Sequence, residues 1–177
     1  MIPTRGKILC EVMARDRLLP SGIWLADKMK SEKKDNVAMV KGVGDGVKEI
    51  RRTDIVHYKQ NFGQKIMWEG KQLIFLKPEE VIAIERDIGI MALGSNVICK
   101  LIQEEKIGTM IVPEMVRQNS GDYHGEVVSV GKDFPDKLTK GDKIIFFRGE
   151  GYRFKTFEGR EELISLQAKW IGGKIGN

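Results

Sequence analysis

Residues 53–85 read TDIVHYKQNFGQKIMWEGKQLIFLKPEEVIAIE, and this stretch decides the fold class. It consists of short apolar or alternating runs rich in Val and Ile, separated by Gly, Asp and Lys: 54–58, 65–68, 73–76 and 81–84. Runs of this length and composition are typical of β-strands. The Glu69-Gly70 step between two of them suits a tight turn, because glycine adopts a positive φ without strain. The stretch predicts strands and turns without a convincing helix.

Two more runs of the same kind lie on the N-terminal side, at 8–13 and 37–43. Six short strands at this spacing, cut by turn residues, favour a small β-barrel. Residues 42–46, GVGDG, do not form a phosphate-binding motif, because no Lys-Ser or Lys-Thr pair and no helix follow them. The predicted fold class is therefore all-β.

The barrel pattern occurs twice in the chain. Residues 6–10, GKILC, are matched 89 residues later by SNVIC at 95–99, and matching turns and strands follow at offsets of 87 to 90 residues. Small changes of offset at loops, with the strands kept in step, indicate a tandem duplication. The boundary falls near Arg86-Asp87, which predicts two barrels, residues 1–86 and 87–177.

Composition narrows the class of protein. Of 177 residues 41% are hydrophobic, which is enough for a real core. The 30 basic and 25 acidic residues are interleaved, and a net charge of +5 does not indicate a dedicated nucleic-acid binder. No leader or apolar run of about 18 residues is present, so we expect no membrane partner. Cys10 and Cys99 lie in apolar strand patterns, which favours buried core thiols over a redox pair.

No catalytic or metal-binding motif stands out. His57 and His124 are isolated, and HExxH, CxxC and GxSxG patterns are absent. Asp54 and Asp142 are equivalent and could mimic a carboxylate pair, but an acidic residue between a turn and a strand more often caps the turn backbone. We expect no enzyme, no cofactor and no metal, and we expect His57 to be an ordinary strand residue.

Residues 17–36 read RLLPSGIWLADKMKSEKKDN and form the first of two unusual loops. The apolar triplet Ile23-Trp24-Leu25 stands between a Pro-Ser-Gly break and a highly charged run, so the segment cannot bury enough of itself to fold alone. Residues 108–113, GTMIVP, repeat this arrangement with Met110-Ile111-Val112. The structural alternative is that Trp24 packs back onto its own domain. Two apolar triplets in matching loops favour a paired binding function.

Several segments carry a resemblance that covers nearly the whole chain. Besides 53–85, the second half contains HGEVVSVG at 124–131, KLTKGDKIIFF at 137–147, GEGYRFK at 149–155 and EGREELISL at 158–166. In this order, and duplicated, they resemble the GroES-type co-chaperonin family, whose members form the lid of the GroEL-type chaperonin cage.

The resemblance implies two tandem GroES-like barrels with long loops and with shortened roof hairpins, since only 45–53 and 132–140 remain for the roofs. It implies that the loops bind the chaperonin through Ile23, Trp24, Leu25, Met110, Ile111 and Val112. The implied function is to cap an ATP-bound ring, as a homo-oligomer that indirectly encloses an unfolded client protein and carries no cofactor. The expected location is the cytoplasm of a bacterium or of a phage-infected host.

The strand edges predict how the barrels join. Residues 81–84 and 88–93 would be exposed edges if each barrel stood alone, so we expect these two runs to pair with each other. The free ends, 2–9 and 163–171, are then expected to join one chain to the next. The family's seven-fold ring cannot be matched evenly by chains that carry two barrels each, which favours a closed ring of few chains.

Two functions from other classes stay open. A structural adaptor, such as a phage virion or assembly component, would use the double barrel as a fixed part of a larger assembly. A nucleic-acid-binding barrel is motivated by the basic balance and by Lys28, Lys30, Lys33 and Lys34, and its binding would depend steeply on salt.

Overall fold

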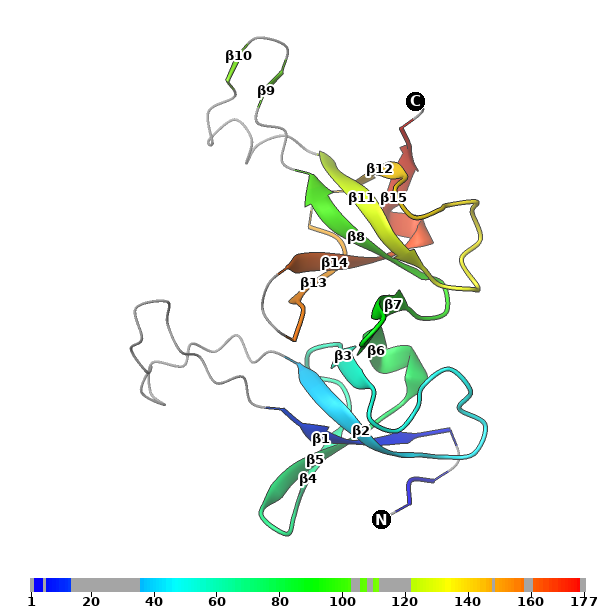
Figure 1. The fold of residues 1–177 in the computed structure, drawn as a ribbon, viewed down its shortest axis with the longest axis vertical. Helices are drawn as coiled ribbons and strands as arrows, with labels where there is room; N and C mark the ends of the chain where they lie inside the picture. Colours follow the sequence, from blue (N-terminus) through cyan, green and yellow to red (C-terminus); the bar gives the residue numbers. More distant parts are fainter. Residues whose placement is uncertain are drawn as a thin grey trace. The chain divides into compact units, whose positions relative to one another are not determined.

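The computed structural model describes residues 2–4, 6–13, 36–102, 106–107, 110–111, 122–147, 149–157 and 161–175. Strands dominate these residues, and the helical elements among them are two single 3-10 turns, Pro78–Glu80 and Ala168–Trp170. The all-β prediction is confirmed. Contacts divide the chain into two units, residues 1–81 and 82–177 (Figure 1).

The first unit is built on antiparallel strands: β1 (Ile8–Val12), β2 (Val37–Val43), β3 (Ile55–Tyr58), β4 (Gln64–Trp68) and β5 (Lys71–Leu76). Their order in the sheet is β4-β5-β1-β2-β3 (Figure 1). The predicted runs 8–13, 37–43, 54–58, 65–68 and 73–76 each overlap one of these strands. Glu69 and Gly70, at the predicted tight turn between β4 and β5, have φ values of 49° and 75°.

The second unit begins within β6 (Val81–Arg86), which forms a hairpin with β7 (Gly89–Ala92). The strands that follow are β8 (Asn96–Ile102), β9 (Lys106–Ile107), β10 (Met110–Ile111), β11 (Asp122–Val130), β12 (Lys143–Phe147), β13 (Tyr152–Lys155), β14 (Glu162–Gln167) and β15 (Ile171–Lys174). Six of them form an antiparallel sheet in the order β13-β14-β8-β11-β12-β15. This order repeats that of the first unit, with β14-β8-β11-β12 in place of β5-β1-β2-β3.

The two sheets share an irregularity at equivalent positions. The register of β1 with β2 shifts after Leu9 and leaves Lys41 out of the ladder. The register of β8 with β11 shifts at the equivalent place and leaves out Val128. A β-bulge bends its strand and fixes the local register, so the same bulge in both repeats is backbone evidence for the duplication.

An ion pair also recurs, with its charges exchanged. Glu11 on β1 lies 3.1 Å from Lys71 on β5, and the equivalent positions hold Lys100 on β8 and Glu161, 3.3 Å apart. The pKa of Glu11 is lowered by its hydrogen bonds to Lys41 and Lys71. Exposed pairs of this kind contribute little to stability. Both charges of the pair are exchanged between the two repeats. This joint exchange indicates that Glu11 and Lys71 occupy the same structural positions as Lys100 and Glu161.

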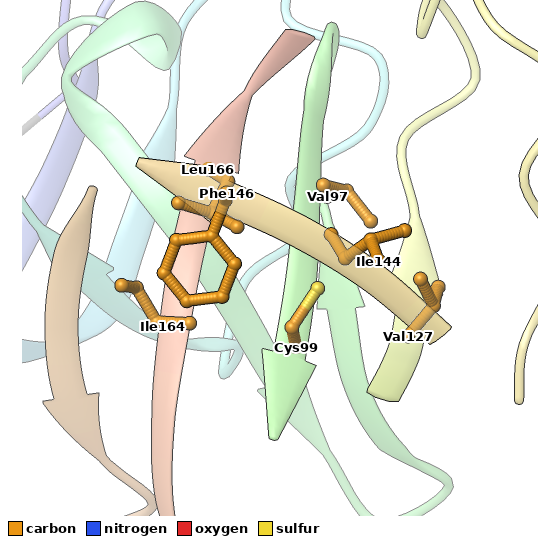
Figure 2. Packing of buried hydrophobic residues seen from close by; sticks show 7 residues of the cluster. All are labelled: Val97, Cys99, Val127, Ile144, Phe146, Ile164 and Leu166. Atoms are coloured by element: carbon orange, nitrogen blue, oxygen red, sulfur yellow. The ribbon is translucent and has the colours of Figure 1, made fainter. Parts of the chain in front are cut away.

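The core of the second unit is a cluster of residues that are at most 1% exposed, drawn from β8, β11, β12 and β14: Val97, Cys99, Val127, Ile144, Phe146, Ile164 and Leu166 (Figure 2). These are alternate residues of their strands, as the two-residue period of side-chain direction requires. Figure 2 shows the Phe146 ring between Ile164 and Leu166, with the Cys99 side chain beside it. Apolar residues at alternate positions of these four strands therefore build this core.

Both cysteines are buried thiols, as predicted. Cys10 and Cys99 are 0% exposed and neither is in a disulfide. Burial in apolar surroundings raises the pKa of each thiol to about 12. Each therefore stays protonated and packs as a small apolar side chain.

The opposite face of β14 and β8, here called the outer face, is covered by the β6–β7 hairpin. Ile82 and Ala83 of β6 form a second apolar cluster with Ile98 and Leu163 of that face. The Ser165 hydroxyl donates a hydrogen bond to the carbonyl of Ile82 (3.3 Å). The outer face of the second unit is therefore a buried surface rather than a solvated one.

The predicted pairing of the strand runs at 81–84 and 88–93 is confirmed, because β6 and β7 are antiparallel partners in which Ala83 faces Ala92 and Ile84 faces Met91. This packing also explains why the contact units divide at the start of β6. The repeat boundary near Arg86-Asp87 stays a prediction.

Residues 45–53 and 132–140, where the roof hairpins were expected to be shortened, contain turns and no strand. Among the described residues, no helix has the length and apolar character needed to cross a bilayer.

Candidate functional site

Both long loops leave and return through neighbouring strands. β1 ends at Val12, which faces Ala38 near the start of β2, and β8 ends at Ile102, which faces His124 near the start of β11. The Met13 amide donates to the Val37 carbonyl (3.0 Å), which closes the base of the first loop. Each loop is thus held at both ends by one antiparallel pair, in the same place of each unit.

The first triplet, Ile23, Trp24 and Leu25, lies outside the described residues, and so does Val112 of the second triplet. The backbone of Met110 and Ile111 forms β10, which pairs with β9 (Met110 with Ile107, Ile111 with Lys106). The sequence predicted only loop here. A two-residue ladder has no signal in a single sequence, because strand patterns need about four residues to be recognised.

The acidic pair Asp54 and Asp142 is confirmed as two turn caps. Asp54 Oδ2 accepts a hydrogen bond from the Arg51 amide (2.7 Å), and Asp142 Oδ2 accepts one from the Thr139 amide (2.8 Å). Asp142 also pairs with Lys174 of β15 (2.8 Å). Each carboxylate therefore caps its own turn, and Asp142 also ties its turn to β15.

The Asp142 pair gives a pH prediction. The hydrogen bond from Lys174, and then the one from the Thr139 amide, lower the pKa of Asp142. A lowered pKa stabilises the folded state above the ordinary value of about 3.9, and this contribution is lost as pH falls through the lowered pKa. Asp142→Asn is therefore expected to reduce the melting temperature at neutral pH and to match the parent chain in acid. Thermal melts from pH 7 to pH 2 test this; a constant difference across that range would contradict it.

The two histidines of the chain lie on strands of different units. His57 is buried on β3, at 1% exposure, and His124 is partly buried on β11. Within the part of the chain that the structure describes, no group of three or more His, Cys, Asp or Glu residues could hold a metal ion. His57 occupies a strand position, as the sequence predicted.

The GVGDG segment is a close backbone crossing. The Gly44 amide donates to the Lys7 carbonyl (2.9 Å), and a Cβ on Gly44 would lie 2.2 Å from the Thr4 carbonyl oxygen. Gly131 is in the same situation, 2.2 Å from the Gly94 carbonyl oxygen. Glycine is required at both positions because a side chain would clash with a backbone carbonyl oxygen. The Gly44 amide donates its hydrogen bond within the unit rather than to a phosphate. The sequence marked this step as a turn but gave no sign of the crossing.

Comparison with known proteins agrees with this architecture. The family model described as the chaperonin 10 kDa subunit, Cpn10, matches residues 1–85 and again residues 89–175. No curated protein matches the chain significantly. The family is not enzymatic, and its general role is that of a co-chaperonin. Since two matches to one family cover almost every residue, on two units with the same strand order and the same bulge, the chain belongs to the GroES-type Cpn10 family and carries the family's domain in tandem.

Proposed function

We propose that this protein caps the ATP-bound ring of a GroEL-type chaperonin and so assists the folding of a client protein enclosed in the cage. Membership of the Cpn10 family in both repeats is the observation that carries the proposal. The residues proposed to bind the chaperonin are Ile23, Trp24 and Leu25 in the first repeat and Met110, Ile111 and Val112 in the second. The proposed location is the cytoplasm.

The energetics of the loops suit a lid that must also leave. Burial of one apolar side chain in a groove contributes roughly 1.5 to 3 kcal/mol, while fixing the backbone costs about 1 to 2 kcal/mol per residue. One triplet alone therefore binds weakly. Several loops presented by one assembly make each later contact intramolecular, which gives firm but reversible attachment. In this proposal the nucleotide chemistry belongs to the chaperonin.

The proposed lid is an assembly of several chains. β15 is an edge strand of its sheet, and Ile2 near the chain start is 89% exposed, so both termini offer surface for pairing. We propose a closed ring of few chains, in which both repeats, 1–86 and 87–177, present a loop. Four chains of 20.1 kDa would weigh about 80 kDa and seven about 141 kDa. Native mass spectrometry separates the two, and a mass near 141 kDa would contradict the use of both repeats in one ring.

The decisive experiment is a pull-down of the full chain with a GroEL-type chaperonin from its own host, with ATP and without nucleotide. Capture that requires ATP is the expected result. Failure of capture in both conditions would overturn the capping proposal and favour a structural adaptor. Binding to nucleic acid that weakens steeply with salt would favour the nucleic-acid-binding barrel instead.

A further inference from the structure

The barrel ends from which the long loops leave carry exposed apolar side chains. Among the large apolar residues that the structure describes, the exposed ones are Ile2, Phe62, Met67, Trp68, Ile88 and Phe147. Strand register places three of them at the loop ends, and these three are here called the rim residues: Met67 and Trp68 in the first unit and Phe147 in the second. A single exposed apolar residue is ordinary, but a gathering at one end of a barrel is typical of a contact surface.

In the first unit the rim lies beside the base of the first loop. Met67 and Trp68 end β4, which forms a hairpin with β5 at the edge of the sheet (Figure 1). Trp68 faces Lys71 across this hairpin. The Lys71 ammonium lies 3.1 Å from the carboxylate of Glu11, next to Val12, where β1 ends and the loop follows. The hairpin tip therefore projects at the loop end of the first barrel.

This hairpin tip displays apolar surface on both of its sides. Glu69 and Gly70 both have positive φ values, 49° and 75°, as a two-residue hairpin turn requires. Consecutive residues of a strand point to opposite faces, so Met67 and Trp68 lie on one face each. Met67 is 68% exposed and Trp68 is 52% exposed. Apolar residues so exposed on an edge strand promote association, which indicates a partner that covers them.

The second unit places its exposed aromatic residue at the same end, but on another strand. Phe147 is the last residue of β12 and faces Asp122, where β11 begins after the second loop. Phe147 follows the core residue Phe146 as Lys59 follows the core residue Tyr58. The first unit therefore has a lysine where the second unit has its rim residue.

The hairpin tip of the second unit is polar where that of the first unit is apolar. Register places Lys155 and Thr156 at the positions that the two rim residues of β4 occupy in the first unit. The amide of the next residue, Phe157, donates a hydrogen bond to Glu85 Oε2 of β6 (2.8 Å), so this tip is engaged within its own unit. Each unit thus keeps an apolar rim at its loop end, although the position of the rim has changed.

The length of the first loop gives such a rim a purpose in binding. Ten residues separate Val12 from Ile23, the first residue of the triplet proposed to bind the chaperonin. A segment of that length spans up to about 33 Å when extended, so the triplet alone holds its barrel loosely against a partner. A second contact at the loop base makes the attachment of each barrel bivalent, which strengthens binding and fixes the orientation of the barrel.

We infer that the rim residues form a second contact with the chaperonin, on an apolar surface of the ring beside the groove that receives the loop triplet. The ring is the occupant because the rim adjoins the base of the loop in each unit. This inference rests on the proposed capping function and adds binding residues that lie on the barrels rather than on the loops. The contact differs between the repeats, with a Met-Trp hairpin tip in the first and one aromatic ring, Phe147, in the second.

Substitution of the first rim tests this contact in the full chain. The double variant Met67→Ser/Trp68→Ser is expected to weaken ATP-dependent capture by the host's GroEL-type chaperonin about tenfold, because two apolar side chains lose their burial. The measured quantity is the chain concentration that gives half-maximal capture. Lys155→Ser/Thr156→Ser is the matched control, at the same hairpin positions of the second unit, and is expected to bind as the parent chain does.

Two results of this experiment would overturn the inference. One is equal capture of the parent chain and of the Met67→Ser/Trp68→Ser variant. The other is an equal loss of capture in the two double variants. Far-UV circular dichroism of each variant verifies that the barrels are folded.

Thiol protection provides a second readout that does not depend on affinity. Cys10 and Cys99 are 0% exposed, so the thiol introduced by Met67→Cys or Phe147→Cys is the accessible one among the described residues. Its alkylation by iodoacetamide is expected to slow about tenfold or more in the chain captured with ATP. The ring without nucleotide is expected to leave the rate unchanged. Lys155→Cys is the control, and its thiol is expected to react equally in the free and the captured chain.

The outcomes of thiol protection separate the possible occupants. Unchanged alkylation of the rim thiols in the captured chain would overturn the inference. Protection that is already complete without the chaperonin would also overturn it, and would assign the rim to a contact between copies of this chain.

Failure of this inference is distinguishable from failure of the capping proposal. Capture of the parent chain with ATP is scored first, and its absence would overturn both. Full capture of the parent chain together with unprotected rim thiols would overturn the rim contact alone, because the loop triplets are then sufficient for binding.

Discussion

Replacement of both apolar triplets by serine, Ile23-Trp24-Leu25 together with Met110-Ile111-Val112, is expected to abolish ATP-dependent capture by a GroEL-type chaperonin while the melting temperature stays the same. Replacement of one triplet removes the burial of three apolar side chains in the proposed groove. This loss of binding free energy lowers the affinity of a single loop about a thousand-fold, before multivalency is counted. The melting temperature is expected to hold because the triplets are proposed to bind the chaperonin, while the described core of the second unit is built from residues of its sheet strands. A pull-down and a thermal melt on the same preparation measure both effects.

The matched control is replacement of Lys28, Lys30 and Lys33 by serine, which changes the charge of the first loop but not its triplet. Capture is expected to persist in this control. A fall in melting temperature in the triplet variants would show that the triplets are packed core, against the docking proposal. Between the two loops, the Trp24 triplet is expected to contribute more, because Trp buries the largest area. Equal losses from the two single-loop variants would count against that ranking.

Phe146→Ala is expected to destabilise the second unit by about 3 to 5 kcal/mol, the usual cost of replacing a fully buried Phe by Ala. Phe146 is 0% exposed, and its ring lies beside Ile164 and Leu166 in the apolar cluster of Figure 2. The lost side chain leaves a cavity that neighbours on four strands cannot close without moving. Urea denaturation followed by circular dichroism measures the change, and two transitions are expected because the chain has two units.

Phe147→Ala serves as the control for this prediction. Phe147 is the next residue of the same strand, but it points to the opposite face and is 51% exposed. Its replacement is expected to change the free energy of unfolding by less than about 1 kcal/mol. If the two variants were equally destabilised, burial in this cluster would not be the source of stability in the second unit.

Local chemistry explains why much of this protein could be predicted from its sequence. Strand positions follow from Val- and Ile-rich runs of four to seven residues, and their side chains alternate between core and surface with a period of two. Asp54 and Asp142 were identified as turn caps because a short carboxylate beside a turn reaches its own backbone within three residues. The tandem repeat was visible because strands tolerate few insertions while loops absorb them.

Contacts between residues far apart in the chain were decided only by the tertiary structure. Ser165 lies 83 residues from Ile82, and no local pattern marks that serine as the partner of a distant carbonyl. The crossings at Gly44 and Gly131 were likewise invisible, because the backbone oxygen that excludes a side chain belongs to another segment.

The sequence by itself determined the fold class, the duplication and the places of the two loops, since each rests on residues that are neighbours along the chain. Which strands cover the outer face of the second unit became visible only in three dimensions. The physical reason is that burial of a sheet face depends on what packs against it, and a strand's own residues do not specify that partner.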